Sequence, residues 1–281
     1  MSQDVFIAAG ARTPMGGLQG DLSSLTAVEL GEAAIRAALA RANLEGGAVD
    51  EVIMGCVLPS GLRQGPARQA AIDAGIPVSV GATTINKLCG SGMKAAMLAF
   101  DQIKAGTNQI MVAGGMESMS RAPYLLPKVR TGLRMGHGEL QDAMFTDGLE
   151  DAKTGRLMGA FAQDVADQFQ VTREDMDDYA IKSLQKALAA IENDALTDEI
   201  VPVEISTRAG KVVISIDEQP GKANLDKIKT LKPAFKADGT VTAANSSSIS
   251  DGASALVLAS SDAVTSNGLK PLAKILGHST H

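Results

Sequence analysis

The sequence contains few aromatic residues and few cysteines. Of its 281 residues only 3% are aromatic and none is tryptophan, which argues against nucleic-acid binding by base stacking. Two cysteines, Cys56 and Cys89, are too few for a disulfide framework and are typical of a protein in a reducing compartment. The three histidines (His137, His278 and His281) have no clustered cysteine or acidic partners at metal-ligand spacing, so we expect no metal site.

Positive charge, long apolar runs and targeting signals are lacking as well. The net charge of −6 does not favour nucleic acid or an anionic membrane as a partner. No run approaches the ~18 apolar residues of a membrane span, and the first four residues, Met-Ser-Gln-Asp, do not begin a signal peptide. With 45% hydrophobic and 21% charged residues, the chain is predicted to be a globular cytoplasmic protein of one large or two smaller domains.

Apolar runs alternate with helical segments through the first 118 residues. Buried strands are expected at residues 5–9, 51–58, 82–85 and 109–113. Helices are expected at residues 26–41, 66–75 and 92–104, the first opened by a capping box at Thr26 and Glu29. This alternation predicts an α/β fold with a largely parallel sheet covered on both faces. The helix at 92–104 is apolar nearly all round and is expected to be buried between layers.

The pattern changes after about Ser118. Residues 119–160 have no clear period and suggest a long functional excursion. A polar helix from about Thr172 to Asn193 follows, and strands are expected at residues 211–216, 255–258 and 272–276. The segment Lys222–Lys236 holds five lysines and one aspartate. It is interpreted as a solvated helix face, with a phosphate-binding patch as the alternative.

Cys89 occupies the most informative position of the chain. The segment Asn86–Ala95 (NKLCGSGMKA) places it at a glycine-bordered turn between a short strand and a long helix. Free N–H groups and the partial positive charge at the helix N-terminus favour a thiolate, so we expect a reactive cysteine in a nucleophile elbow. The alternative is a small buried residue packed under the helix. Cys56, within an apolar run, is expected to be a core residue.

Several motifs in a fixed order carry a resemblance to a known family. Besides Asn86–Ala95, they lie at residues 112–120, 144–149, 157–159, 231–235 and 239–253. Together they resemble the thiolase family, the acetyl-CoA C-acetyltransferases and acyltransferases, over the whole chain. The resemblance implies a layered αβαβα fold made of two similar α/β halves. Here it implies an N-terminal domain at 1–118 and 245–268, a CoA-binding loop domain at 119–244, and only the start of a C-terminal domain at 269–281.

The resemblance also implies roles for individual residues. Cys89 would be the nucleophile that accepts the acyl group. The residues implied to line the CoA site are Leu149, Met158, Leu231, Phe235, Ala243 and Ser247, and Lys222 could supply a charge there. Coenzyme A and acyl-CoA are then substrates, with no further cofactor. Because members of the family are dimers or tetramers, the resemblance also implies a homodimer or homotetramer.

Three departures from the family pattern stand out. Leu157 stands where short-chain biosynthetic members often carry a histidine, which favours a degradative role or a broader acyl preference. The arginine that often follows the family's Asp-Glu-x-Pro stretch is missing. Lys222, close to that position, could supply a positive charge but not the two parallel hydrogen bonds of a guanidinium. The Asn-Glu-Ala-Phe, Gly-His-Pro and Cys-x-Gly-Gly-Gly motifs of the C-terminal half are not among the 281 residues. In the family that this chain resembles, these motifs carry the histidine that activates the nucleophile and the second cysteine.

The expected function is therefore that of a thiolase, an acyl-CoA C-acyltransferase. It exchanges an acyl group between CoA and a 3-ketoacyl-CoA through an acyl-Cys89 intermediate, and the 281-residue chain by itself is expected to be nearly inactive. The alternative is a non-catalytic fragment that binds acyl-CoA or pairs with a sibling subunit. A related condensing enzyme such as a ketoacyl synthase fits the loop-domain motifs less well. Acyl chain length and reaction direction stay open.

Overall fold

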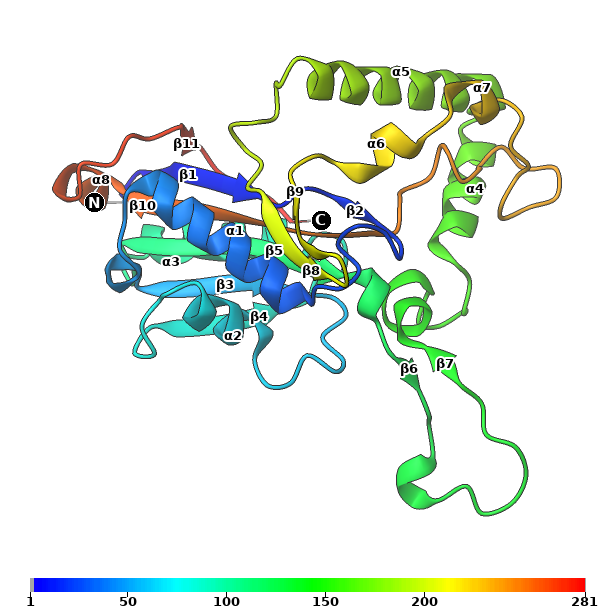
Figure 1. The fold of residues 1–281 in the computed structure, drawn as a ribbon, viewed down its shortest axis with the longest axis horizontal. Helices are drawn as coiled ribbons and strands as arrows, with labels where there is room; N and C mark the ends of the chain where they lie inside the picture. Colours follow the sequence, from blue (N-terminus) through cyan, green and yellow to red (C-terminus); the bar gives the residue numbers. More distant parts are fainter. Residues whose placement is uncertain (1–2, 281) are drawn as a thin grey trace.

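A seven-stranded mixed sheet forms the centre of the computed structural model (Figure 1). The structure describes residues 3–280. Met1 and Ser2 of the expected N-terminal domain, and His281 of the expected C-terminal domain, lie outside the described residues. The strand order is β11-β1-β10-β5-β3-β4, and the short β2 also pairs with β10. Their bounds are β1 Val5–Arg12, β2 Gly16–Gly17, β3 Glu51–Gly55, β4 Gly81–Ile85, β5 Ile110–Ser118, β10 Ser250–Ser260 and β11 Ala273–Ile275.

The strand directions correct one expectation from the sequence. β3 pairs in parallel with β4 and β5, as predicted for strands joined by helices. β10, however, pairs antiparallel with both β5 and β1, and β11 pairs antiparallel with β1. The chain leaves the sheet at Ser118 and re-enters directly beside it at Asp251, the two being register partners. Because it returns at the end where β5 stops, β10 must run the opposite way, so the prediction of a largely parallel sheet is wrong for this side.

Helices cover the two faces of the sheet unequally. α1 (Ala27–Ala42) and α2 (Pro66–Asp73) pack with one face into the larger apolar core. The predicted capping box is present, since the Thr26 hydroxyl accepts the Glu29 N–H and the Glu29 carboxylate accepts the Thr26 N–H. α3 (Ser91–Lys104) packs on the other face, where its residues join Ile53 and Leu258.

Only one side of α3 is buried, contrary to the expected burial between two layers. Ala95, Ala99 and Ile103 are fully buried against the sheet, whereas Met93 on the outer side is 68% exposed. The C-terminal residues run over this helix, where the His278 ring meets Phe100 edge-on at 5.3 Å. The outer face of α3 is therefore only partly covered by the residues described.

The segment between β5 and β10 forms a separate set of small elements (Figure 1). Two strand pairs lie in it: β6 (Tyr124–Leu125) with β7 (Gln141–Asp142), and β8 (Val203–Thr207) with β9 (Gly210–Ile214). The helices are α4 (Met158–Gln168), α5 (Arg173–Glu192), α6 (Glu218–Lys222) and α7 (Leu225–Ile228). α5 confirms the helix expected after Thr172, whose side chain caps it. Short helical turns lie at Gly46–Ala48, Met119–Arg121, Val129–Thr131 and Phe145–Leu149, and α8 spans Ser261–Ser266.

Two neighbouring carboxylates fasten this excursion to the sheet. Asp217 accepts two hydrogen bonds from the Arg12 guanidinium, at 2.7 and 3.0 Å, and one from the Met15 N–H. The buried Glu218 accepts the N–H groups of Gly17 and Asp21. Burial alone would raise the pKa of Asp217, but the hydrogen bonds from Arg12 and Met15 outweigh it and hold that pKa below its ordinary value.

Asp217→Asn is expected to lower the free energy of unfolding by about 2 kcal/mol at pH 7, because Arg12 loses its partly buried partner. A carboxyl with a lowered folded-state pKa stabilises the fold above its ordinary pKa and loses that contribution as the pH falls through the folded-state value. The variant should therefore lose less stability than the wild type below about pH 4. Urea unfolding at several pH values measures this, with Asp73→Asn on the exposed end of α2 as control. Equal pH slopes in wild type and variant would contradict it.

Candidate active site

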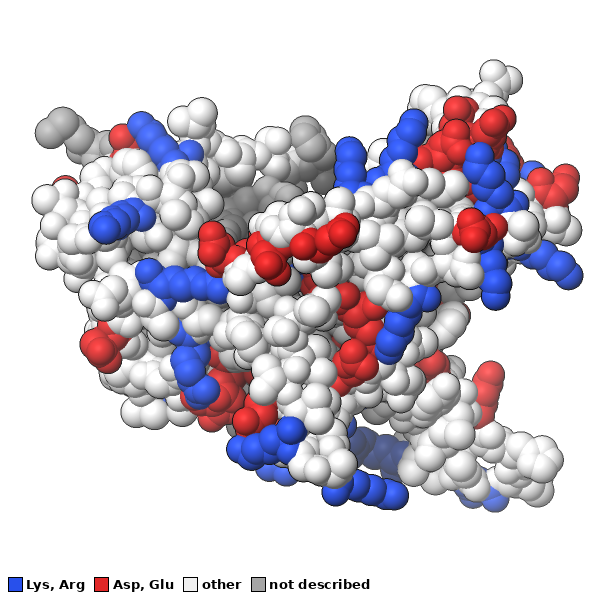
Figure 2. All heavy atoms as spheres, turned by 45° about the horizontal axis from the view of Figure 1, so that its top comes forward, with Lys and Arg blue, Asp and Glu red and all other residues white. Residues whose placement is uncertain are grey.

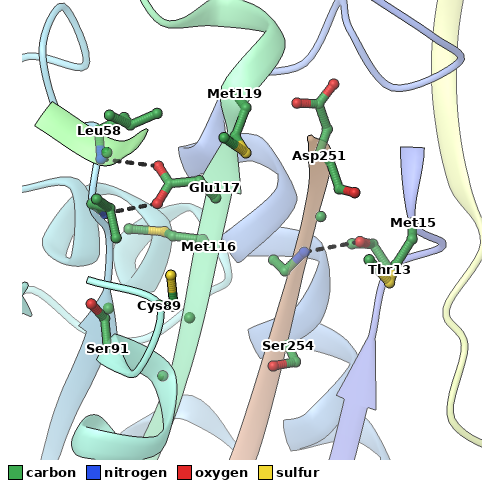
Figure 3. A pocket seen from close by; sticks show the side chains of 18 of the residues that line it. Thr13, Met15, Leu58, Cys89, Ser91, Met116, Glu117, Met119, Asp251 and Ser254 are labelled. Atoms are coloured by element: carbon green, nitrogen blue, oxygen red, sulfur yellow. Dashed lines mark hydrogen bonds between the residues drawn. The ribbon is translucent and has the colours of Figure 1, made fainter. Parts of the chain in front are cut away.

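Cys89 opens into a cavity at the carboxyl ends of the parallel strands β3, β4 and β5 (Figure 3). The cavity measures about 480 Å³, and its wall is mostly apolar, including Met15, Val57, Leu58, Met116, Met119 and Leu149. Ligand sites of α/β proteins commonly lie at this edge of a sheet. Cys89 itself is exposed, so the alternative of a buried packing cysteine is wrong.

The turn that carries Cys89 is fixed by two side chains. The Asn86 amide oxygen accepts the Leu88 N–H at 2.9 Å. The Ser91 hydroxyl accepts the Lys87 N–H at 2.8 Å and donates to the Leu88 carbonyl at 2.6 Å. Leu88 is held at φ +50°, a conformation that is costly for a residue with a side chain. These contacts present Cys89 at the N-terminus of α3, as expected for a nucleophile elbow.

Glycines let α3 approach the sheet beneath this turn. A Cβ on Gly55 would lie 2.5 Å from the Ser91 Cβ and 2.8 Å from the Gly92 nitrogen. Gly92 and Gly115 also meet closely, since a Cβ on Gly115 would lie 3.3 Å from the Gly92 Cα. The start of α3 therefore rests directly on the backbone of β3 and β5.

Two acidic residues share the cavity with Cys89. The Glu117 carboxylate accepts the Val57 N–H at 2.7 Å and the Leu58 N–H at 3.1 Å. Burial raises the pKa of Glu117, against the effect of these two bonds. Asp251 is fully buried; its Oδ1 accepts the Ser120 N–H, and its Oδ2 has no hydrogen-bond partner among residues 3–280. Asp251 is not among the residues that the sequence analysis expected at the site.

Cys56 is a core residue, as expected. It is 1% exposed, and its Sγ lies 3.6 Å from a Glu117 oxygen. Burial and the nearby carboxylate raise the pKa of the Cys56 thiol to about 12. At neutral pH this cysteine is protonated and is no substitute nucleophile.

A second cavity, of about 670 Å³, lies between α5, α6 and α7 and the chain that returns to β10. It is lined by Tyr179, Ser183, Leu184, Pro220, Asn224, Lys227, Leu231, Ala243, Asn245 and Ser248, among others. Ser248 lines this cavity and Ser250 lines the Cys89 cavity, and their hydroxyls are 2.7 Å apart. The two cavities are therefore neighbours.

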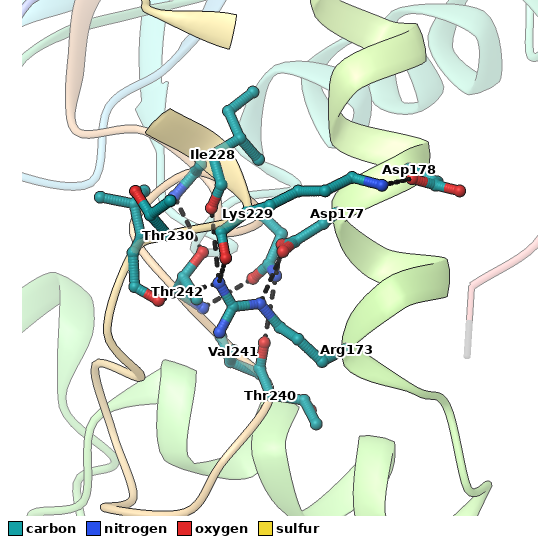
Figure 4. A network of polar contacts seen from close by, with 12 residues as sticks. Arg173, Asp177, Asp178, Ile228, Lys229, Thr230, Thr240, Val241 and Thr242 are labelled. Atoms are coloured by element: carbon teal, nitrogen blue, oxygen red, sulfur yellow. Dashed lines mark hydrogen bonds and ion pairs between the residues drawn. The ribbon is translucent and has the colours of Figure 1, made fainter. Parts of the chain in front are cut away.

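A partly buried polar network connects the walls of the second cavity (Figure 4). The Arg173 guanidinium pairs with Asp177 at 2.7 Å and donates to the Leu231 carbonyl at 2.8 Å. The other Asp177 oxygen accepts the Asn245 amide at 3.0 Å, and Asn245 Oδ1 in turn accepts the Thr242 N–H. Leu231 on one wall and Asn245 on the other are thus tied to the same helix, α5.

The residues implied to bind CoA are spread over both cavities and their surroundings. Leu149 lines the Cys89 cavity, while Leu231 and Ala243 line the second one. Met158 is 44% exposed at the start of α4, beside the place where the Phe235 ring covers Gly159. These positions leave their role in CoA binding a prediction.

Ser247 and Lys222 line neither cavity. Ser247 is exposed on the chain between them. Lys222 forms ion pairs with Glu218 and Asp21 instead. Their proposed contacts with CoA therefore also stay predictions.

Most of the lysine-rich segment is neutralised by nearby carboxylates. Lys229 pairs with Asp178 and Lys236 with Asp167, each at 2.8 Å. Figure 2 shows basic and acidic side chains interleaved at this end of the molecule rather than a uniformly basic face. Lys227 differs: it lines the second cavity, and residues 3–280 offer it no ion pair. This is the lysine of the segment best placed to meet a bound anion.

Residues 3–280 contain neither a membrane-spanning helix nor a cluster of metal ligands. No helix there is both long enough and apolar enough to cross a membrane. In the same residues, no group of three or more histidine, cysteine or acidic side chains is arranged to hold a metal ion.

Comparison with known proteins decides the family. The model of the thiolase N-terminal domain matches residues 5–262. The chain belongs to the thiolase family. Acetyl-CoA acetyltransferase 2 of Arabidopsis thaliana is 52% identical over 279 residues, which are 98% of this chain and 69% of that protein. These two matches confirm the family expected from the motifs, and the name of the Arabidopsis relative agrees with the expected enzyme class.

Solved structures confirm the fold. The acetyl-CoA acetyltransferase from Syntrophomonas wolfei superposes with a TM-score of 0.95 at 40% identity, covering 99% of this thiolase and 70% of that chain. The Acat5 thiolase from Ascaris suum, solved in complex with coenzyme A, gives a TM-score of 0.92 at 42% identity, covering 98% and 70%. The expected thiolase-like α/β fold is therefore present, while the expected domain bounds stay predictions. β11, at the start of the expected C-terminal domain, extends this sheet beside β1.

Proposed function

We propose that this thiolase chain is an acyl-CoA C-acyltransferase whose Cys89 accepts an acyl group from an acyl-CoA. The observation that carries the proposal is the exposed Cys89, held in a strained turn inside an apolar cavity next to a second cavity. The Arabidopsis relative is named an acetyl-CoA acetyltransferase, and the Ascaris structure holds coenzyme A. Both support CoA thioesters as substrates.

In the proposed step, Cys89 Sγ attacks the thioester carbonyl carbon of acyl-CoA. The bond from that carbon to the CoA sulfur breaks, CoA leaves as a thiol after taking up a proton, and the acyl group stays on Cys89 as a thioester. The partial positive charge at the N-terminus of α3 would favour the developing negative charge. Transfer of the acyl group to a second acyl-CoA would complete the exchange with a 3-ketoacyl-CoA. For this full exchange we still expect the 281-residue chain by itself to be nearly inactive, because it lacks the motifs to which the resemblance assigns the activating histidine and the second cysteine.

For the CoA part of the substrate we propose the second cavity. Its volume and apolar residues, Leu184, Leu231 and Ala243 among them, suit a pantetheine chain, and Lys227 offers a cation to a phosphate. The hydroxyls of Ser248 and Ser250 join the linings of the two cavities, and we propose that the pantetheine chain passes there toward Cys89. The homodimer or homotetramer implied by the resemblance remains part of the proposal, as does the cytoplasmic location expected from the composition.

Incubation with acetyl-CoA followed by intact-mass analysis tests the proposed acylation. The wild type is expected to gain one acetyl group, and Cys89→Ala to gain none, because the acceptor sulfur is gone. Cys56→Ala serves as the matched control and should still be acetylated, since Cys56 is buried and protonated. No adduct on a folded wild type would contradict the proposal for this chain and favour the non-catalytic acyl-CoA-binding alternative.

A further inference from the structure

The segment that follows β3 lies between Glu117 and the turn of Cys89. On the side of the turn it makes three contacts. Gly55 packs under Ser91, the Cys56 N–H donates to the Ile85 carbonyl at 3.0 Å, and the Val57 carbonyl accepts the Asn86 amide at 3.3 Å. Asn86 is the residue whose oxygen also holds the Leu88 N–H. The segment 55–58 is therefore part of the frame that orients the nucleophile turn.

On its other side the same segment is fastened by one side chain. Glu117 reaches from β5 and accepts the N–H groups of both Val57 and Leu58, and the Cys56 thiol lies 3.6 Å from its Oε1. Figure 3 shows the carboxylate between the strand and this segment, with both N–H bonds drawn. Both oxygens are used for these bonds.

We propose that Glu117 is a positioning residue for Cys89, acting through Val57 and Asn86 rather than on the reacting atoms. This inference deepens the proposed function and rests on it for its rate measurement. A general base needs a free lone pair directed at the proton it takes. The Glu117 carboxylate is directed at the N–H groups of Val57 and Leu58, so its geometry fits holding the segment 56–58.

A carboxylate is required for this arrangement. It offers two acceptor oxygens to two N–H donors, whereas a glutamine offers one oxygen and directs an NH₂ group at the other donor. Glu117→Gln therefore leaves one buried N–H unpaired and frees one end of the segment. The Val57 carbonyl then no longer holds Asn86 in a fixed place, and the Cys89 turn loosens.

Hydrogen exchange of backbone amides tests the coupling without any need for activity. In Glu117→Gln, faster exchange is expected at Val57 and Leu58, and also at Leu88 and Ser91 in the turn. Asp50→Asn is the matched control: Asp50 also accepts two backbone N–H groups, those of Gln109 and Ile110, at the opposite end of β5. This control should leave exchange in the turn unchanged.

The rate of Cys89 acetylation by acetyl-CoA gives the second readout. Glu117→Gln is expected to slow it about tenfold at saturating acetyl-CoA without raising the half-saturating concentration, because orientation rather than binding is lost. Faster exchange confined to 57–58, with a normal turn and a normal rate, would overturn the inference.

Two further outcomes are also decisive. If the wild type is not acetylated, the proposed function fails, and the exchange experiment alone still decides the coupling. If Glu117→Gln does not fold, Glu117→Asp, which withdraws the carboxylate by one methylene but keeps both acceptors, is measured in the same two ways. Unchanged exchange in the turn of Glu117→Asp, with loosened 57–58, would then overturn the inference.

Discussion

Gly114→Ala is expected to lower the free energy of unfolding by about 3 kcal/mol or more. A Cβ at this position would overlap the carbonyl oxygen of Ser254 and lie 2.9 Å from the Ala255 Cα. Both are backbone atoms of β10, which is paired with β5 on one side and β1 on the other. Because β10 cannot move away without breaking one of these pairings, the added methyl group must distort the centre of the sheet.

Urea unfolding followed by circular dichroism measures this loss. Gly221→Ala is the matched control: this glycine lies in α6, and a Cβ there would meet no atom within 4 Å. The control should change stability by less than about 1 kcal/mol, since only the chain entropy differs. A Gly114→Ala protein as stable as this control would show that β10 can shift, contrary to the packing described.

Features encoded by neighbouring residues could be predicted from the sequence. The capping box at Thr26 needs only residues 26–29, and α5 needs only its cap and its period. The turn of Cys89 belongs to the same class, because Asn86 and Ser91, which hold it, lie within five residues of one another. Hydrogen bonds between neighbouring residues are the signal that makes such elements predictable.

Features that depend on distant segments could not be predicted. The direction of β10 is set by where the chain returns after an excursion from Ser118 to Ser250. The exposed side of α3 could not be predicted for the same reason, because an apolar pattern all round a helix does not indicate which residues cover each of its sides. In both cases the sequence predicted the element itself correctly, but it did not show which other segment would pack against that element.

The candidate site divides along the same line. Cys89 and Leu149 are marked by their own motifs and do line one cavity. Glu117 joins them because β5 pairs with β3, and Asp251 joins them because β10 pairs with β5. The lysines illustrate the limit best: Lys222 was chosen by its place in a motif, yet it pairs with Glu218, while Lys227 lines the second cavity. Lys222 and Lys227 are only five residues apart, and the sequence alone does not show which of the two lysines lines a cavity.

Gly55→Ala is expected to slow the acetylation of Cys89 by about 100-fold. The new Cβ would lie 2.5 Å from the Ser91 Cβ and 2.6 Å from the Ser91 carbonyl carbon. Ser91 can escape this contact only if the start of α3 moves away from β3. Since the Ser91 hydroxyl holds Lys87 and Leu88, that movement carries the Cys89 turn with it.

Acetylation by acetyl-CoA, measured by intact mass over time, gives the rate, and Gly81→Ala is the matched control. Gly81 also lies in the sheet, in β4, but a Cβ there would meet only the Glu51 Cγ at 3.7 Å. The control should react at the wild-type rate. A folded Gly55→Ala protein that reacts as fast as the control would mean that the position of α3 does not govern Cys89. The contacts of Asn86 alone would then have to explain how the nucleophile is held.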